Sequence, residues 1–96
     1  MQVVEYYIIL QIKTPDGFEP YGKFATGQSL PNALNIFNQL KGNSDCSFTD
    51  YLQIDLISVN NQMPRHLKMM SCSLEDIAEN CRIVTREIFK LRNMET

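Results

Sequence analysis

The stretch that decides the fold is residues 3–13, which read Val-Val-Glu-Tyr-Tyr-Ile-Ile-Leu-Gln-Ile-Lys. β-branched and aromatic residues dominate it. Val4, Tyr6, Ile8, Leu10 and Ile12 alternate with the positions between them. Side chains of a strand point in turn to the two faces of a sheet, so this period of two predicts a long strand with one buried face.

The residues that follow predict a hairpin. Thr14-Pro15-Asp16-Gly17 suits a tight turn, because proline fixes φ at the first central position and glycine tolerates positive φ. Residues 18–26 then return as a second strand. Pro20 cannot donate a ladder hydrogen bond and Gly22 weakens a strand, so this strand is expected to lie at the edge of the sheet or to carry a bulge.

A first helix is predicted over residues 30–41. Ser29 is a favourable N-cap, and the apolar residues after it recur at helical spacing. Lys41 suits the negative end of the helix, and Gly42 is expected to end it in a left-handed conformation.

The second half of the chain repeats this order of elements. Leu52, Ile54 and Leu56 predict a third strand over residues 51–59, followed by a turn at 60–64. A short fourth strand is predicted over residues 65–70, with Leu67 and Met69 pointing inward.

A long helix is predicted over residues 74–92. Ser73 is its N-cap, and Asp76 three residues later makes a variant of the capping box. Acidic residues lie early in the helix and basic residues late, which complements the helix dipole. The expected buried stripe comprises Leu74, Ile77, Ala78, Cys81, Val84, Ile88 and Leu91.

These elements predict one α+β domain over residues 1–96, with the order β-β-α-β-β-α. The expected architecture is a two-layer sandwich in which a mostly antiparallel four-stranded sheet carries both helices on one face. An offset of 44 residues aligns 3–42 with 51–92 and pairs Ser29 with Ser73. This alignment suggests a weak β-β-α duplication, and two unrelated units with similar turns remain the alternative.

Composition limits the classes of function. The net charge is −2 and the pI about 5.2, which disfavours nucleic acid and anionic lipid as partners. No apolar run reaches the roughly 18–20 residues that cross a membrane. The N-terminal apolar run is interrupted by Glu5 and does not resemble a signal peptide. With three cysteines, an odd number at wide spacings, the chain is expected in the cytoplasm.

No motif predicts a catalytic residue, a metal site or a cofactor. A zinc site could be assembled from Cys46, His66, Cys72 and Cys81, but the close cysteine pairs usual in such sites are missing. Cys72 precedes a helix, where the dipole can stabilise a thiolate, and His66 could act as its base. The alternative is a structural thiol and a solvent-facing histidine.

Two surface features remain. Arg82, Arg86 and Lys90 recur every four residues and form a possible basic ridge on the second helix. The alternative, which is favoured, is a solvated helix face on which Glu79 and Glu87 alternate with these cations. The sheet face opposite the helices is expected to be too apolar for open exposure, which favours a partner-binding surface. The alternatives are that residues 43–50 or the C-terminal tail cover this face, or that the strands have the opposite inward phase. Its predicted partner-binding residues are Tyr7, Ile9, Tyr21, Tyr51, Ile57 and Val59.

The sequence therefore favours a small non-enzymatic protein-interaction module that forms a homodimer, or binds another protein, through the open sheet face. A second hypothesis is single-stranded nucleic-acid binding, with tyrosines stacking on bases. A third is a small enzyme that uses Cys72 and His66.

Overall fold

The computed structural model describes residues 3–43 and 52–94 of the chain. Its elements are β1 (Val4–Thr14), β2 (Gly17–Gly27), α1 (Leu30–Asn38), β3 (Leu52–Asn60), β4 (Met63–Cys72) and α2 (Leu74–Met94). The order β-β-α-β-β-α confirms the predicted fold class. Most strand boundaries agree with prediction to within one residue.

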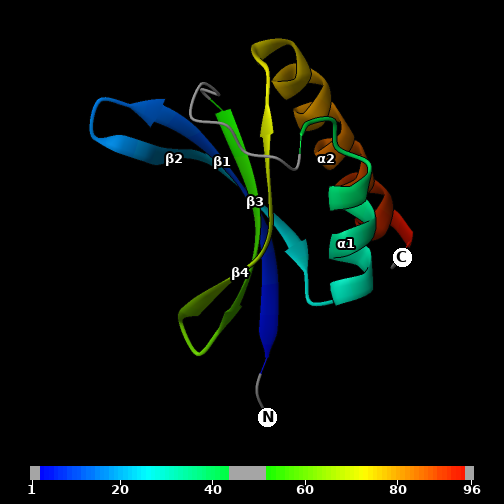
Figure 1. Ribbon diagram of the computed structural model, residues 1–96. Coiled ribbons are helices and arrows are strands. Elements are labelled where there is room, and N and C mark those ends of the chain that lie inside the picture. Colours follow the sequence, from blue (N-terminus) through cyan, green and yellow to red (C-terminus); the bar gives the residue numbers. More distant parts are fainter. Residues whose placement is uncertain (1–2, 44–51, 95–96) are drawn as a thin grey trace.

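The four strands form one antiparallel sheet in the order β2-β1-β3-β4, with both helices packed on the same face (Figure 1). The two most apolar strands, β1 and β3, are therefore central, and each is paired on both sides. Ile8 lies opposite Leu56 and Leu10 opposite Ile54. The proline-bearing strand β2 lies at an edge, as predicted.

Both hairpins turn through residues with unusual backbone angles. Gly17 has a φ of 116° at the end of the first turn. The second turn is Asn61-Gln62, with φ values of 54° and 66°. Positive φ at both central residues is the geometry of a type I′ turn, whose twist matches that of the two strands.

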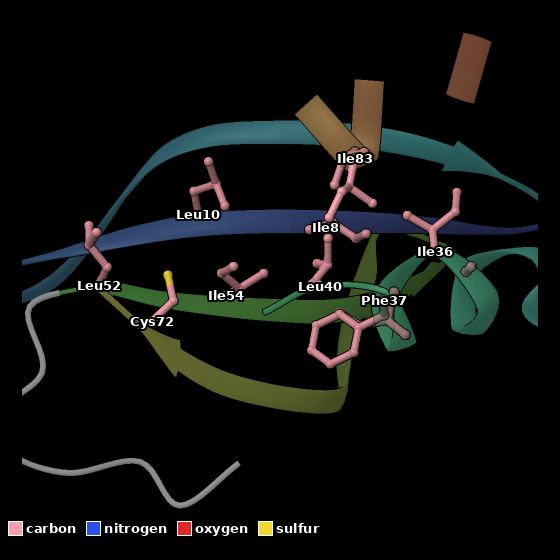
Figure 2. Packing of buried hydrophobic residues seen from close by; sticks show 12 residues of the cluster. Ile8, Leu10, Ile36, Phe37, Leu40, Leu52, Ile54, Cys72 and Ile83 are labelled. Carbon is pink, nitrogen blue, oxygen red and sulfur yellow. The ribbon is translucent and has the colours of Figure 1, made fainter. Parts of the chain in front are cut away.

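The hydrophobic core lies between the sheet and the helices (Figure 2). Ile8, Leu10, Leu52 and Ile54 supply the sheet side of the core. The other side includes Ile36 and Phe37 of α1, Leu40 just after α1, and Ile83 of α2. These sheet residues are the ones that the period-two alternation predicted to face the helices.

Both helices reach the other β-β-α unit at particular points, although α1 makes its main backbone contacts in the sheet with β1 and β2 of its own unit. At the C-terminal end of α1, Lys68 of β4 donates a hydrogen bond to the Asn38 side chain at 3.2 Å, and Asn43 pairs with Ser71 in an isolated bridge. Ile88 and Leu91 of α2 line a hollow with the end of β2. The contacts of α1 with β4 and of α2 with β2 therefore join the two β-β-α units to each other.

The end of α1 differs from prediction. The helix stops at Asn38, with Gln39 as a right-handed C-cap, and Gly42 is not among the glycines with positive φ. Gly42 is instead needed for close approach: a Cβ there would lie 2.5 Å from the Ser71 carbonyl oxygen and 2.8 Å from Met70 Sδ.

The predicted inward phase of β4 is wrong. Met70 lies opposite Ile54 and packs against the core, and Cys72 is a core residue, whereas Leu67 and Met69 are exposed. A register shift between Leu56 and Ile57 leaves one extra residue on β4. Such a bulge changes which alternate residues face inward, and nothing in local composition announces it.

The buried stripe of α2 also differs from prediction at its N-terminal end. Leu74 and Ala78 are exposed, while Asn80 and Ile83 are buried. The Asn80 side chain accepts a hydrogen bond from the Lys41 amide at 2.7 Å and donates one to the Lys41 carbonyl at 2.8 Å. These two bonds satisfy the buried amide and attach the end of α1 to α2.

The internal duplication stays a prediction. In the central strand pair, Leu10 lies opposite Ile54, which is also its equivalent at the offset of 44 residues. The two β-β-α units are thus arranged around the β1–β3 pair.

Candidate interaction surface

The candidate surface is the sheet face opposite the helices. Tyr7 of β1 lies beside Ile57 of β3, and Ile9 lies beside Asp55, one pair further along. These positions alternate with the core residues Ile8 and Leu56, so their side chains point away from the helix layer. In the described part of the chain, both helices pack on the other face.

The residues of this face differ in accessibility. Tyr7, Ile9 and Val59 are partly exposed, and Met69 of β4, opposite Asp55, is 44% exposed. Ile57 lies on the predicted face but is only 6% exposed. Its side chain therefore packs beneath its neighbours and offers little area for contact with a partner. Met69 was missed in the sequence because the bulge in β4 reverses its expected direction.

Tyr21 does not lie with the other residues of the predicted patch. It is the extra residue at a register shift in β2, next to Gly22, whose position faces the Leu10 side chain on the helix side. Partial burial and the nearby Cys81 and Cys72 thiols raise the pKa of its hydroxyl. Tyr51, the remaining predicted member, lies outside the described residues.

Tyr7 is held in place by charged neighbours. Its hydroxyl donates a hydrogen bond to Glu5, and this bond, together with desolvation and the carboxylate charge, raises the pKa of the phenol. The Lys23 ammonium lies 4.1 Å from the centroid of the ring, within the range of a cation–π contact. The ring is therefore fixed between one anion and one cation.

A polar group occupies the middle of the same face. Asp55 is 1% exposed and accepts hydrogen bonds from the side-chain amides of Gln11 and Gln53, the latter at 3.1 Å. His66 Nδ1 lies 3.6 Å from the Asp55 carboxylate, which is beyond a hydrogen bond. The two amides compensate for much of the lost hydration of the carboxylate. A single acid between Ile54 and Leu56 was the sequence feature that could have indicated this group.

The predicted basic ridge is present, but each of its cations has an acidic neighbour. Arg82 makes two hydrogen bonds to Glu79, the shorter at 2.6 Å. Arg86 and Lys90 each lie 3.2 Å from Glu87. The ridge therefore has little unbalanced positive charge to offer a phosphate backbone.

Cys72 and His66 do not come together. Cys72 is buried in the core on the helix side of the sheet, whereas His66 is on the opposite face beside Asp55. Cys46 lies outside the described residues. Over residues 3–43 and 52–94, the His, Cys, Asp and Glu side chains do not gather in groups of three that could hold a metal ion.

Comparisons with protein-family models, with curated proteins and with solved structures found no match. Within the described residues, neither helix has the length and apolar character needed to cross a membrane.

Proposed function

We propose that this chain is a non-enzymatic protein-interaction module that associates with a second copy of itself through the open sheet face. The observation that carries the proposal is the set of partly exposed apolar residues on a face that the helices leave uncovered: Tyr7, Ile9, Val59 and Met69. Removing such a patch from water is the main source of free energy in protein association.

The charges around Tyr7 support a second copy as the partner. Glu5 and Lys23 lie on either side of the ring, so this part of the surface carries one anion and one cation. In a contact with two-fold symmetry the same patch meets itself, and Glu5 of one copy can approach Lys23 of the other. Tyrosine suits such a contact because it adds buried area with little loss of rotamer entropy.

We also place the chain in the cytoplasm. Cys81 is present as a thiol, and an odd number of cysteines fits a reducing compartment better than an oxidising one.

The test is the solution mass of the chain as a function of concentration. We expect wild-type protein to exceed the 11.1 kDa of one chain. Tyr7→Glu and Met69→Glu should each weaken the association about tenfold or more, because each places a charge in the contact. Met63→Glu is the matched control: Met63 is also exposed, but it lies at the tip of the second hairpin, opposite Asn60. Sedimentation equilibrium measures all four proteins.

Wild-type protein that stays monomeric at millimolar concentration would exclude self-association. Salt-sensitive retention of single-stranded oligonucleotides by that monomer would favour the nucleic-acid hypothesis instead.

A further inference from the structure

Helix α2 carries a second apolar stripe beside the one that packs in the core, and Cys81, which is partly buried against the core, lies where the two stripes meet. The residues at positions 74, 78, 81, 85 and 89 recur every three or four positions and therefore share one side of the helix. They are Leu74, Ala78, Cys81, Thr85 and Phe89.

This side of α2 is exposed. Leu74 is 74% exposed and Phe89 67% exposed, the two largest side chains of the stripe. Between them the residues are small, and a shallow groove is lined by Cys81, Thr85, Phe89 and the two arginines Arg82 and Arg86. Tyr21 of the edge strand β2 is half exposed; partial burial, followed by the nearby Cys81 thiol, raises the pKa of its hydroxyl.

Charge is divided along α2 in a way that suggests what occupies the stripe. Residues 74–80 contain three carboxylates and no cation, whereas residues 82–92 contain four cations and one carboxylate. Salt bridges within the helix join Arg82 to Glu79 and join Arg86 and Lys90 to Glu87. Once these pairs are discounted, a net charge of about −2 is left on the N-terminal half and about +2 on the C-terminal half. A second α2 running in the opposite direction would place its basic half against the acidic half of the first. The helix dipoles would also be antiparallel, which is the favourable arrangement.

We propose that α2 pairs antiparallel with α2 of a second copy through Leu74, Ala78, Cys81, Thr85 and Phe89. The contact is isologous, so each residue has its partner through the two-fold axis. The stripe extends from residue 74 to 89, and its midpoint lies beside Cys81. Leu74 then packs on Phe89 of the other copy, and Ala78 faces Thr85, where small side chains allow close approach of the helices.

This contact is separate from the sheet-face contact proposed above, and it is small. The sixteen residues from 74 to 89 form a helix about 24 Å long. One pair of helices of this length buries less surface than a tight dimer does. A dissociable dimer in the micromolar range or weaker is therefore expected. The two contacts lie on different sides of the molecule, so together they would give species larger than a dimer.

The first test uses charge reversal in a Tyr7→Glu background, where the sheet-face contact is removed. Glu75→Arg places a cation opposite the basic half of the other copy, and Arg86→Glu places a carboxylate opposite the acidic half of the other copy. Each variant alone should dimerise about tenfold more weakly than the Tyr7→Glu parent, because like charges then face each other. An equimolar mixture of the two should regain the parent's association, and 0.5 M salt should reduce these differences. Circular dichroism spectra and thermal melts check that each variant is folded.

The second test uses Cys81 as a reporter of the two-fold axis. Diamide removes two electrons and two protons from a pair of thiols and joins them as a disulfide, which requires Cα atoms within about 7 Å. A cross-linked dimer should form in the Cys46→Ser variant and be lost in the Cys46→Ser/Cys81→Ser variant.

Two results would overturn the inference. One is a Tyr7→Glu protein that is monomeric throughout, while wild type still associates; the sheet-face proposal would then stand alone. The other is a mixture of the two charge variants that associates no better than either variant. A third result is also informative: wild type and Tyr7→Glu have the same solution mass, larger than that of one chain, and the mixture of charge variants recovers association. In that case the self-association takes place through α2 alone, and the sheet-face proposal is wrong.

Discussion

Gly42 and Glu87 show how single residues connect the helices to the rest of the molecule. Gly42 lies where the chain leaving α1 passes β4, against the Ser71 carbonyl and the Met70 side chain. Glu87 receives hydrogen bonds from Gln39, at the end of α1, and from Arg86, and it forms a salt bridge with Lys90. The contacts of Gly42 with Ser71 and of Glu87 with Gln39 join residues that are remote in sequence.

Replacement of Gly42 by alanine is expected to destabilise the protein by roughly 1–3 kcal/mol, because the new methyl group would overlap a backbone oxygen. Gly22→Ala is the matched control. Its methyl group would meet the flexible end of the Leu10 side chain at 3.3 Å, so the loss should be smaller. Urea unfolding measures both, and equal losses would contradict the steric explanation.

The stability of the protein should fall in acid partly through Glu87. The hydrogen bond from Gln39, followed by that from Lys90, lowers the pKa of this carboxyl, in spite of some desolvation. A lowered pKa contributes stability above the unfolded value of roughly 4.3, and that contribution is lost as pH falls through the folded pKa. Glu87→Gln should therefore lose less stability than wild type between pH 7 and pH 3. Equal losses in the two proteins would count against this role.

At the scale of elements, the second hairpin turns through a residue poorly suited to its backbone conformation. Gln62 has a φ of 66°, and Asn61 before it has a φ of 54°. Asparagine tolerates the left-handed region because its short polar side chain can form local hydrogen bonds. Glutamine has a longer side chain that lacks this compensation, so the left-handed conformation is unfavourable for it.

Gln62→Gly is expected to stabilise the protein by about 0.5–1 kcal/mol, since glycine removes this strain. Asn61→Gly should gain less. Thermal unfolding of both variants measures the difference, and a destabilised Gln62→Gly protein would show that the turn does not retain this conformation in solution.

At the scale of the whole molecule, neither β-β-α unit is expected to fold alone. The core joins Ile8 and Leu10 of the first unit to Ile54, Leu56 and Val84 of the second. The pairing of β1 with β3 and the attachment of Asn80 to Lys41 also cross between the units.

Chains 1–46 and 47–96, prepared separately, should therefore lack the circular dichroism of the intact protein, and an equimolar mixture should recover much of it. Intact protein cleaved at this point is the control for the effect of the chain break. A fragment that unfolds cooperatively by itself would contradict the interlocked arrangement.

Local pattern determined much of this fold. Alternation in residues 3–13 and 51–59 predicted two long strands and the face that the helices cover, because the pleat of a strand sends successive residues to opposite sides. Ser29 and Ser73 each accept the hydrogen bond expected of an N-cap, from Asn32 and Asp76. These features depend on residues within one turn or one strand, so the sequence alone contains them.

Tertiary structure decided the details of the surfaces. The bulges move Tyr21 to the helix side and Met69 to the open face, because one extra residue changes the direction of the side chains around it. The orientation in which α2 packs on the sheet buries Asn80 and Ile83 and leaves Leu74 exposed. The apolar sheet face that the sequence indicated is present, but its membership changed, and α2 gained a second exposed stripe. A hydrophobic pattern shows that a residue can be buried; only the packing of neighbouring elements determines whether it is.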